Sequence, residues 1–427
     1  MTQDPLQDAP DQPDTKPGQA ARFAAFESPF LHAPEGARGV FLVTFAAGCG
    51  PLAAGLLLFG WRAGLVAAVS IASCALIERL YYYVTKTPAL LGRSHAYLVG
   101  LLLALTLPAY VPFYVPVVGA AFAIIVGKGV FGGVGHFIWQ PALVGRLAVA
   151  VLFSTQLTTP APNHPGSGPI LAQGRLLVGD IRSAGYQDRF KTWRDSQASP
   201  GADALLVRRP EVTLKYVTNR RDPEFSGLTI RNPGTLDSGT LAMLKLPPIN
   251  EMIYGARPGG IGETCIIVIV VSGLYLVYRN YVRLQLPLVF IAAAACVAAI
   301  APVCLSGPHG TTVARWFPSV IKAEGSDAWL MYVAYQLLTG EIFLAAFLLA
   351  AETTSRPVTV GGQVIFAACG GALAMLGKLY IDTPIPAYMA VLAVNTMTVV
   401  IDDFWRPRVF GQKHFAMLMG WRKEKEP

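Results

Sequence analysis

The chain has 427 residues, of which 53% are hydrophobic and only 14% are charged. Soluble domains carry roughly 25% charged residues, so this composition excludes an ordinary water-soluble protein and indicates a surface that faces lipid. The formal net charge is +8, but the basic residues flank apolar segments, where they orient helices, and we therefore expect no nucleic-acid partner. The cysteines lie in or beside apolar runs without the spacing of a zinc or iron–sulfur site, so no metal site is predicted.

Apolar segments long enough to cross a bilayer begin after a polar N-terminal stretch. A span needs about 20 mostly apolar residues, because the hydrocarbon core is about 30 Å thick. Residues 1–37 are polar and rich in Pro, Asp and Gln, which predicts a disordered cytoplasmic tail. Residues 38–156 form a first predicted half of five spans, at about 38–60, 63–84, 95–110, 113–127 and 140–156.

A long polar segment separates these spans from a second set. Residues 157–258 mix acidic and basic residues with short alternating stretches, and we expect a small domain or ordered loop outside the membrane. Residues 406–427 form a basic tail that is expected in the cytoplasm. Residues 259–405 form the second predicted half, with spans at about 261–278, 284–305, 328–352, 362–380 and 384–402.

The fold class that follows is an all-α polytopic membrane protein with about ten transmembrane helices. Five spans before the long segment and five after it are typical of two pseudo-symmetric halves related as an inverted repeat, although the halves show no detectable sequence identity. Basic residues are more frequent in the loops on one side, so the positive-inside rule places both termini in the cytoplasm and the long segment outside.

Two glycine-rich stretches predict interrupted helices inside the membrane. The first contains Gly132, Gly133 and Gly135, and the second, at the start of the second half, contains Gly260 and Gly262. Broken helices place free backbone N–H and C=O groups at membrane depth, where they can line an ion or cofactor pathway. The alternative is that the glycines only allow close helix packing. Their occurrence in both halves favours the pathway.

Acidic residues within apolar segments are the other candidate pathway residues. A charge at a helix centre costs about 3 kcal/mol on insertion scales, so such residues indicate function. Glu341 lies deepest in an apolar run, and Glu263 follows a glycine break, where it is a candidate for a cation pathway or a helix cap. For Glu78 and Glu352, capping or salt bridging is as good an interpretation. The histidines are too scattered to ligate haem on facing helices.

Several motifs in the right order carry a family resemblance. Gly-Lys-Gly-Val-Phe-Gly-Gly-Val-Gly and Gln-Pro-Ala-Leu-Val-Gly-Arg lie between Pro108 and Arg146, and Gly-Gly-Ile-Gly-Glu-Thr begins at Gly259. The chain closes with Asn395-Thr-Met-Thr-Val-Val-Ile-Asp-Asp-Phe-Trp-Arg-Pro-Arg-Val-Phe-Gly411. Over about residues 28–411 the chain resembles the D subunit of Rnf electron-transport complexes and the related B subunit of the sodium-pumping NADH:quinone oxidoreductase.

The resemblance implies cofactors and an attachment site for one of them. Family members carry FMN joined by a phosphoester to a threonine of an SGAT-like motif in the long outer segment, and some also hold riboflavin. The corresponding stretch here lacks the alanine and contains Ser238, Gly239 and Thr240, which makes Thr240 the first candidate for the attachment site. Thr229, in Ser-Gly-Leu-Thr, is the second candidate. Either threonine is alternatively an ordinary loop residue.

The function that the resemblance implies is electron transfer through flavins coupled to movement of Na⁺ or H⁺. The protein would lie in the bacterial inner membrane with other Rnf- or NQR-like membrane, flavin and iron–sulfur subunits as partners. No residue of this chain is predicted to be catalytic, because a flavin supplies the redox chemistry. Two alternatives share the architecture: an ion channel or transporter without a redox role, and a membrane scaffold for redox subunits.

Overall fold

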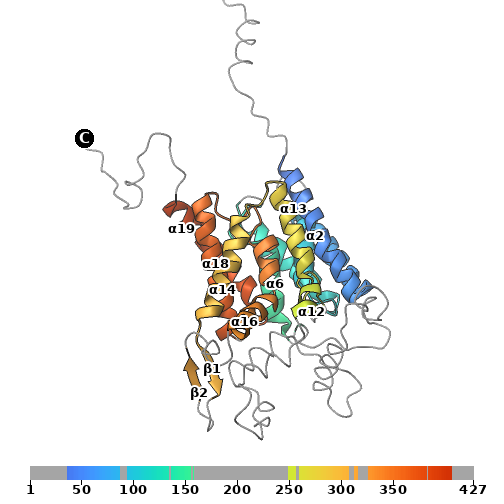
Figure 1. Cartoon of the computed structure of the whole chain (residues 1–427). Helices are drawn as coiled ribbons and strands as arrows, with labels where there is room; N and C mark the ends of the chain where they lie inside the picture. The colour runs from blue at the N-terminus through green and yellow to red at the C-terminus, as the bar shows by residue number, and fades with distance from the viewer. Residues whose placement is uncertain are drawn as a thin grey trace, which may run out of the picture.

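A computed structural model shows a bundle of helices that pass up and down along a common direction (Figure 1). The N-terminal helix begins at the upper end in that view, and a short β-hairpin projects from the lower end. Nearly all of the described backbone is helical, as the apolar composition predicts. The structure describes residues 36–86, 94–133, 136–154, 157, 249–255, 259–306, 312–315, 326–381 and 383–405.

The first half begins with two long helices that are joined by a single glycine. Gly60 has a φ of 79°, which a residue with a side chain rarely adopts, and the chain reverses direction there. A second reversal, at residues 107–113, contains two prolines that cannot continue a helix. The elements are α2 (Ala37–Phe59), α3 (Trp61–Thr85), α4 (Ser94–Thr106), α5 (Tyr114–Ala121), the π-helix η1 (Phe122–Gly129) and α6 (Pro141–Leu152).

The second half adds a hairpin that the sequence did not predict. In it, β1 (Val303–Ser306) pairs antiparallel with β2 (Thr312–Arg315). The remaining elements are α12 (Ile249–Tyr254), α13 (Ile266–Tyr278), α14 (Gln285–Ile300), α16 (Ser326–Leu338), α17 (Ile342–Leu344), the π-helix η3 (Ala345–Leu349), α18 (Val360–Tyr380) and α19 (Pro386–Phe404).

Four of the described helices, α2, α3, α18 and α19, are long and apolar enough to cross a membrane. The predicted span at 328–352 falls on a pair of helices that are apolar enough together but are bent by 63° between Tyr332–Leu338 and Ile342–Leu349. Gly340, with a φ of 89°, makes the bend. The other five predicted spans fall on shorter apolar helices, which are α4, α5 with η1, α6, α13 and α14. The chain is a multi-pass helical membrane protein.

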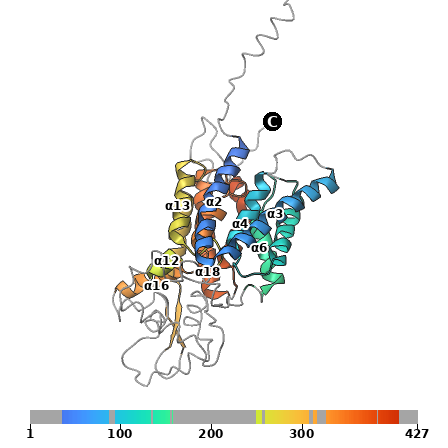
Figure 2. The same cartoon turned by 90° about the vertical axis from the view of Figure 1, so that its right-hand side faces the viewer.

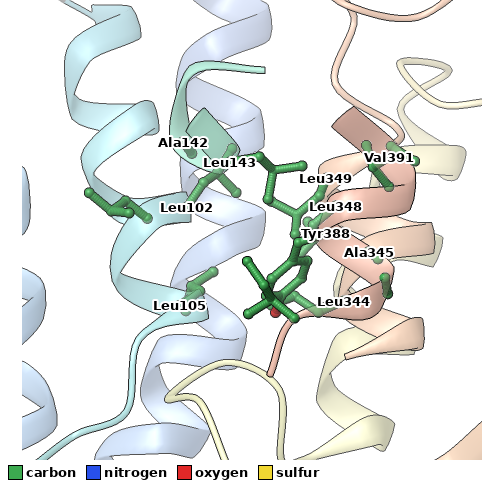
Figure 3. Close-up of a cluster of buried hydrophobic side chains, with 14 of the residues drawn as sticks. Leu102, Leu105, Ala142, Leu143, Leu344, Ala345, Leu348, Leu349, Tyr388 and Val391 are labelled. Carbon is green, nitrogen blue, oxygen red and sulfur yellow. The ribbon is translucent and has the colours of Figure 1, made fainter. Parts of the chain in front are cut away.

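One buried core runs through both halves. α2 lies beside α13, and α6 lies against α19, so neither half is wrapped only by its own helices (Figure 2). Figure 3 shows the contact at the centre, where leucines of α4 and α6 meet leucines of η3 and the first turns of α19. The labelled residues are Leu102, Leu105, Ala142, Leu143, Leu344, Ala345, Leu348, Leu349, Tyr388 and Val391.

Glycines set the closest helix contacts in both halves. In the first half, Gly145 of α6 lies against the backbone of Gly119 in α5. In the second, a Cβ on Gly371 of α18 would fall 2.9 Å from the carbonyl carbon of Phe290 in α14, and closer still to its oxygen. Small residues let membrane helices approach closely enough for van der Waals contact to stabilise them.

We predict that Gly371→Ala destabilises the protein and that Gly39→Ala does not. A methyl group at Gly371 meets rigid backbone, and overpacking of this kind costs about 1–3 kcal/mol. A Cβ at Gly39 of α2 meets no heavy atom within 4 Å. Thermal unfolding of the two variants in detergent checks this, and equal midpoints for both would contradict a packing role for Gly371.

Candidate functional site

The first turn of α19 brings the two predicted pathway carboxylates together. The backbone N–H of Ala387 donates to Glu341 Oε1 over 2.8 Å, and the hydroxyl of the next residue, Tyr388, donates to Glu263 Oε1. Each carboxylate is only 5% exposed, and Tyr388 is fully buried. The sequence identified both glutamates but gave no sign that they share a partner helix.

Glu263 is held by the loop at residues 259–265, which precedes α13. Its second carboxylate oxygen accepts from the N–H of Gly260 over 2.7 Å. A side chain at Gly260 would collide with this carboxylate, since a Cβ there would lie 2.6 Å from Glu263 Cδ. The glycine therefore lets the backbone close tightly around Glu263, and this is the break that the sequence predicts.

The same loop pairs with the end of α4 in the other half. The N–H of Ile261 donates to Leu107 O over 2.9 Å, and the N–H of Gly262 donates to Leu105 O over 2.8 Å. These bonds satisfy carbonyls that the end of α4 would otherwise leave open. A Cβ on Gly262 would lie 2.7 Å from Leu105 Cβ, so a larger residue would separate the two backbones.

Glu341 lies at the break in the α16–α17 span, and the break is stabilised from both sides. The ammonium of Lys378 in α18 donates to the carbonyls of Gln336 and Thr339 and, over 2.6 Å, to Thr339 Oγ1. A cation at the carbonyl end of α16 and an anion at the N–H end of α19 both complement the helix dipoles. Lys378 was not among the predicted site residues, although a lysine within an apolar run is itself a signal.

Arg146 adds a positive charge to this junction from the first half. It lies on α6, is 1% exposed, and acts electrostatically on the Tyr388 hydroxyl, as do Glu263 and Glu341. The side-chain amide of Asn395 in α19 is oriented so that both its oxygen and its nitrogen have partners. In this orientation its oxygen accepts a hydrogen bond from the backbone N–H of Gln140, just before α6, over 3.2 Å. Arg146 was also not predicted as a site residue, and it again is a charged residue within an apolar run.

The other predicted glycines lie at a different place, in the connection between η1 and α6. Gly132 and Gly133 have φ values of 94° and 103°, and a Cβ on Gly133 would come 3.7 Å from the Tyr82 hydroxyl. Beside them, Lys128 of η1 donates to Glu78 of α3. Gly132 and Gly133 thus lie in the turn after η1, where an ion pair of its own adjoins them, and not beside Glu263 or Glu341.

Some predicted site residues lie outside the described part of the chain. These are Gly135 and the candidate flavin residues Thr229, Ser238, Gly239 and Thr240. Within the described residues, no group of three or more His, Cys, Asp and Glu side chains is arranged to hold a metal ion. The chemistry that the described site offers is therefore that of two buried carboxylates, a phenol and two cations, which suits binding of a small cation or a proton.

Comparisons with known proteins agree over nearly the whole chain. A family model described as the NQR2, RnfD, RnfE family matches residues 25–411. The chain is 28% identical over 375 residues to the D subunit of an ion-translocating oxidoreductase complex from Halorhodospira halophila, covering 87% of this chain and 90% of the relative. A Stutzerimonas stutzeri protein with the same name is 29% identical, over 84% and 87% of the two chains.

A third relative has a name that specifies an ion. It is the D subunit of a proton-translocating ferredoxin:NAD(+) oxidoreductase complex from Clostridium ljungdahlii. It is 27% identical over 359 residues, covering 84% of this chain and 87% of the relative.

We predict that Glu341 stabilises the start of α19. Glu341→Ala removes the acceptor for the Ala387 N–H, and loss of a helix cap costs about 1–2 kcal/mol. Glu341→Gln keeps an acceptor and loses only the charge–dipole interaction, for which we expect about half of that cost. Chemical unfolding in mixed micelles measures both variants, and a wild-type stability for Glu341→Ala would rule out the capping role.

Proposed function

The chain belongs to the NQR2, RnfD, RnfE family, and on this premise we propose that it is the membrane subunit of a redox-driven ion-translocating oxidoreductase. Relatives that are named as D subunits of such complexes align with most of its length. Its partners in this proposal are other membrane, flavin and iron–sulfur subunits. The complex lies in the bacterial inner membrane with both termini of this chain in the cytoplasm.

The observation that carries the proposal is the meeting of Glu263 and Glu341 at the first turn of α19. A purely structural membrane helix rarely holds two buried carboxylates, because each is costly to place away from water. Here the loop of Glu263 meets the end of α4, and Glu341 lies at the break before α17. Tyr388 donates to Glu263, and Arg146 acts electrostatically on the Tyr388 hydroxyl. We propose that Glu263 and Glu341 bind the translocated cation, Na⁺ or H⁺, during its passage.

We further propose that the bundle consists of about ten spans in two inverted halves. A repeated pattern supports this: Gly127-Lys128 precedes Pro141-Ala142, and Gly377-Lys378 precedes Pro386-Ala387. In each half the glycine faces the proline: a Cβ on Gly127 would be 2.8 Å from Pro141 Cα, and one on Gly377 would be 3.3 Å from Pro386 Cβ. Each proline opens the helix that ends its half.

The directions of the paired helices also support inverted halves. Gly127 and Lys128 lie in the last turn of η1, beside the last turns of α3, which ends at the same end of the bundle as the start of α2 (Figure 2). The Gly377 pair lies near the opposite end, where Tyr380 of α18 donates to Pro302 O beside the hairpin. Lys128 and Lys378 therefore occupy corresponding positions at opposite ends, and only Lys378 holds a broken helix.

We propose that the long segment between the halves carries FMN, attached through a phosphoester to Thr240, and that riboflavin is a second cofactor. A flavin supplies one- and two-electron transfer when it is bound. The support is the Ser238-Gly239-Thr240 motif and the family membership. Thr229 is the alternative attachment residue.

Replacement of Tyr388 tests the cation site. Tyr388→Phe leaves the buried Glu263 carboxylate without a hydroxyl donor, and hydrogen bonds to charged groups contribute about 1.5–3 kcal/mol, so we expect ion uptake per electron to fall about tenfold or more. Glu263→Gln should have at least this effect. Ion uptake by inverted vesicles carrying the whole complex, followed with Na⁺- and pH-sensitive dyes, gives the measurement.

Tyr332→Phe is the matched control for this experiment. Tyr332 is a tyrosine of α16 whose hydroxyl accepts from Gln336 over 3.2 Å, away from both carboxylates. We expect its ion uptake to remain within about twofold of wild type, because the hydrogen bond that the variant loses is to Gln336 and not to either carboxylate. Equal uptake by the two tyrosine variants would exclude the Glu263 junction from the pathway.

The flavin proposal predicts a fluorescent band from the denatured chain, after expression with a flavin transferase. Thr240→Val should abolish in-gel ultraviolet fluorescence, because valine has no hydroxyl to form the phosphoester, and Thr229→Val should keep it. If Thr229→Val abolishes the band and Thr240→Val keeps it, the attachment site is Thr229. A wild-type chain without any band would favour a channel, transporter or scaffold function in place of a flavin carrier.

A further inference from the structure

A buried histidine–glutamate pair joins the two halves at the opposite end of α4 from the Glu263 loop. His95 is the second residue of α4, and Glu352 follows η3; His95 Nε2 and Glu352 Oε1 are 3.2 Å apart. The imidazole is fully buried and Glu352 is 4% exposed. In the sequence His95 is one of several scattered histidines, and nothing there marks it out, because its partner lies 257 residues away.

Aromatic rings shield the imidazole from water. Phe41 of α2 meets the His95 ring edge-on with centroids 4.8 Å apart, and Phe137 stacks on it at 5.4 Å. These contacts fix the ring so that it faces the carboxylate. An imidazole held in this way exchanges protons through its nitrogens and its carboxylate partner rather than directly with bulk water.

A small cavity adjoins the carboxylate. It has a volume of about 10 Å³, and its polar lining is Thr44 of α2, Tyr281, Glu352 and Thr353, the rest being apolar side chains. Three buried polar atoms of this region have no hydrogen-bond partner among the described residues: His95 Nδ1, Glu352 Oε2 and the Tyr281 hydroxyl. A space of this size with several polar partners fits one water molecule.

Two arginines contact Tyr281, one at its backbone and one at its ring. Arg356 donates to the Tyr281 carbonyl over 2.7 Å, and the Arg279 guanidinium lies 5.8 Å from the centre of its ring. Burial, and then the neighbouring charge of Arg283, lowers the pKa of Arg356 to about 10, so it stays charged at neutral pH.

We propose that His95 and Glu352 form a proton-binding site, fed through the water-sized cavity. The proton binds to the neutral imidazole of His95 and converts it to imidazolium beside the ionised carboxylate, so the pair as a unit changes from a net charge of about −1 to neutral. Imidazole changes charge near physiological pH, whereas a hydrated metal cation is larger than the cavity. The site is distinct from Glu263 and Glu341 and does not depend on the redox proposal.

Histidine-labelled NMR of the full-length chain in micelles tests the site. The chain has six histidines, so imidazole nitrogen signals can be resolved, and His95→Gln identifies the signal of interest by its loss. We expect that signal to change from the protonated to the neutral form as pH rises. In Glu352→Gln the change should come at a pH lower by about one unit or more, because the carboxylate that favours the imidazolium is gone.

His136→Gln is the matched control, because His136 is exposed and outside the pair. It should leave the His95 titration at the wild-type pH. If Glu352→Gln does not fold, Glu352→Asp keeps the charge one methylene further away and should give an intermediate shift. A His95 signal that stays in one form across the pH range overturns the proposal. Loss of the protonated His95 signal on addition of NaCl at constant pH also overturns it, because that result would assign the cavity to sodium.

Discussion

The rest of the structure depends on the rule that backbone groups inside a membrane need partners within the protein. The span from α16 to η3 breaks this continuity at Gly340, and the carbonyl end that the break exposes is satisfied by a charged side chain from another helix. Lys378 of α18 donates to the carbonyls at the end of α16, while the Glu341 side chain accepts from a backbone N–H at the start of α19. The break therefore accounts for the burial of Lys378 and Glu341 at these positions.

The same rule connects the two halves. α4 ends inside the bundle, and the loop that carries Glu263 satisfies its last carbonyls through Gly262 and Ile261. That loop is fixed at its other side because Glu263 accepts from Tyr388. Glu263 is thus held by contacts that also join α4 of the first half to α19 of the second, and a change in its charge acts on both of these helix ends.

Much of this arrangement can be predicted from the sequence, and its limits have a physical reason. Apolar run lengths predict most of the spans, and an acidic residue within such a run marks Glu263 and Glu341. The run at 328–352 hides its break, because one glycine in an apolar segment is equally typical of close packing. The partners stay hidden because they are distant in sequence: Tyr388 is 125 residues from Glu263. Contacts of this range follow from packing, which the periodicity of a sequence does not reveal.

α4 places the two ionisable sites at opposite ends of one short helix. His95 opens it and Leu105 closes it against the Glu263 loop, and ten residues of α-helix span about 15 Å. The side chains between them include Leu98, Leu101 and Leu102, which are fully or almost fully buried members of the apolar core. An ion that passed from one site to the other would have to cross this apolar layer. We therefore expect that any coupling between the two sites acts through the packing of this apolar layer rather than through a direct ion path.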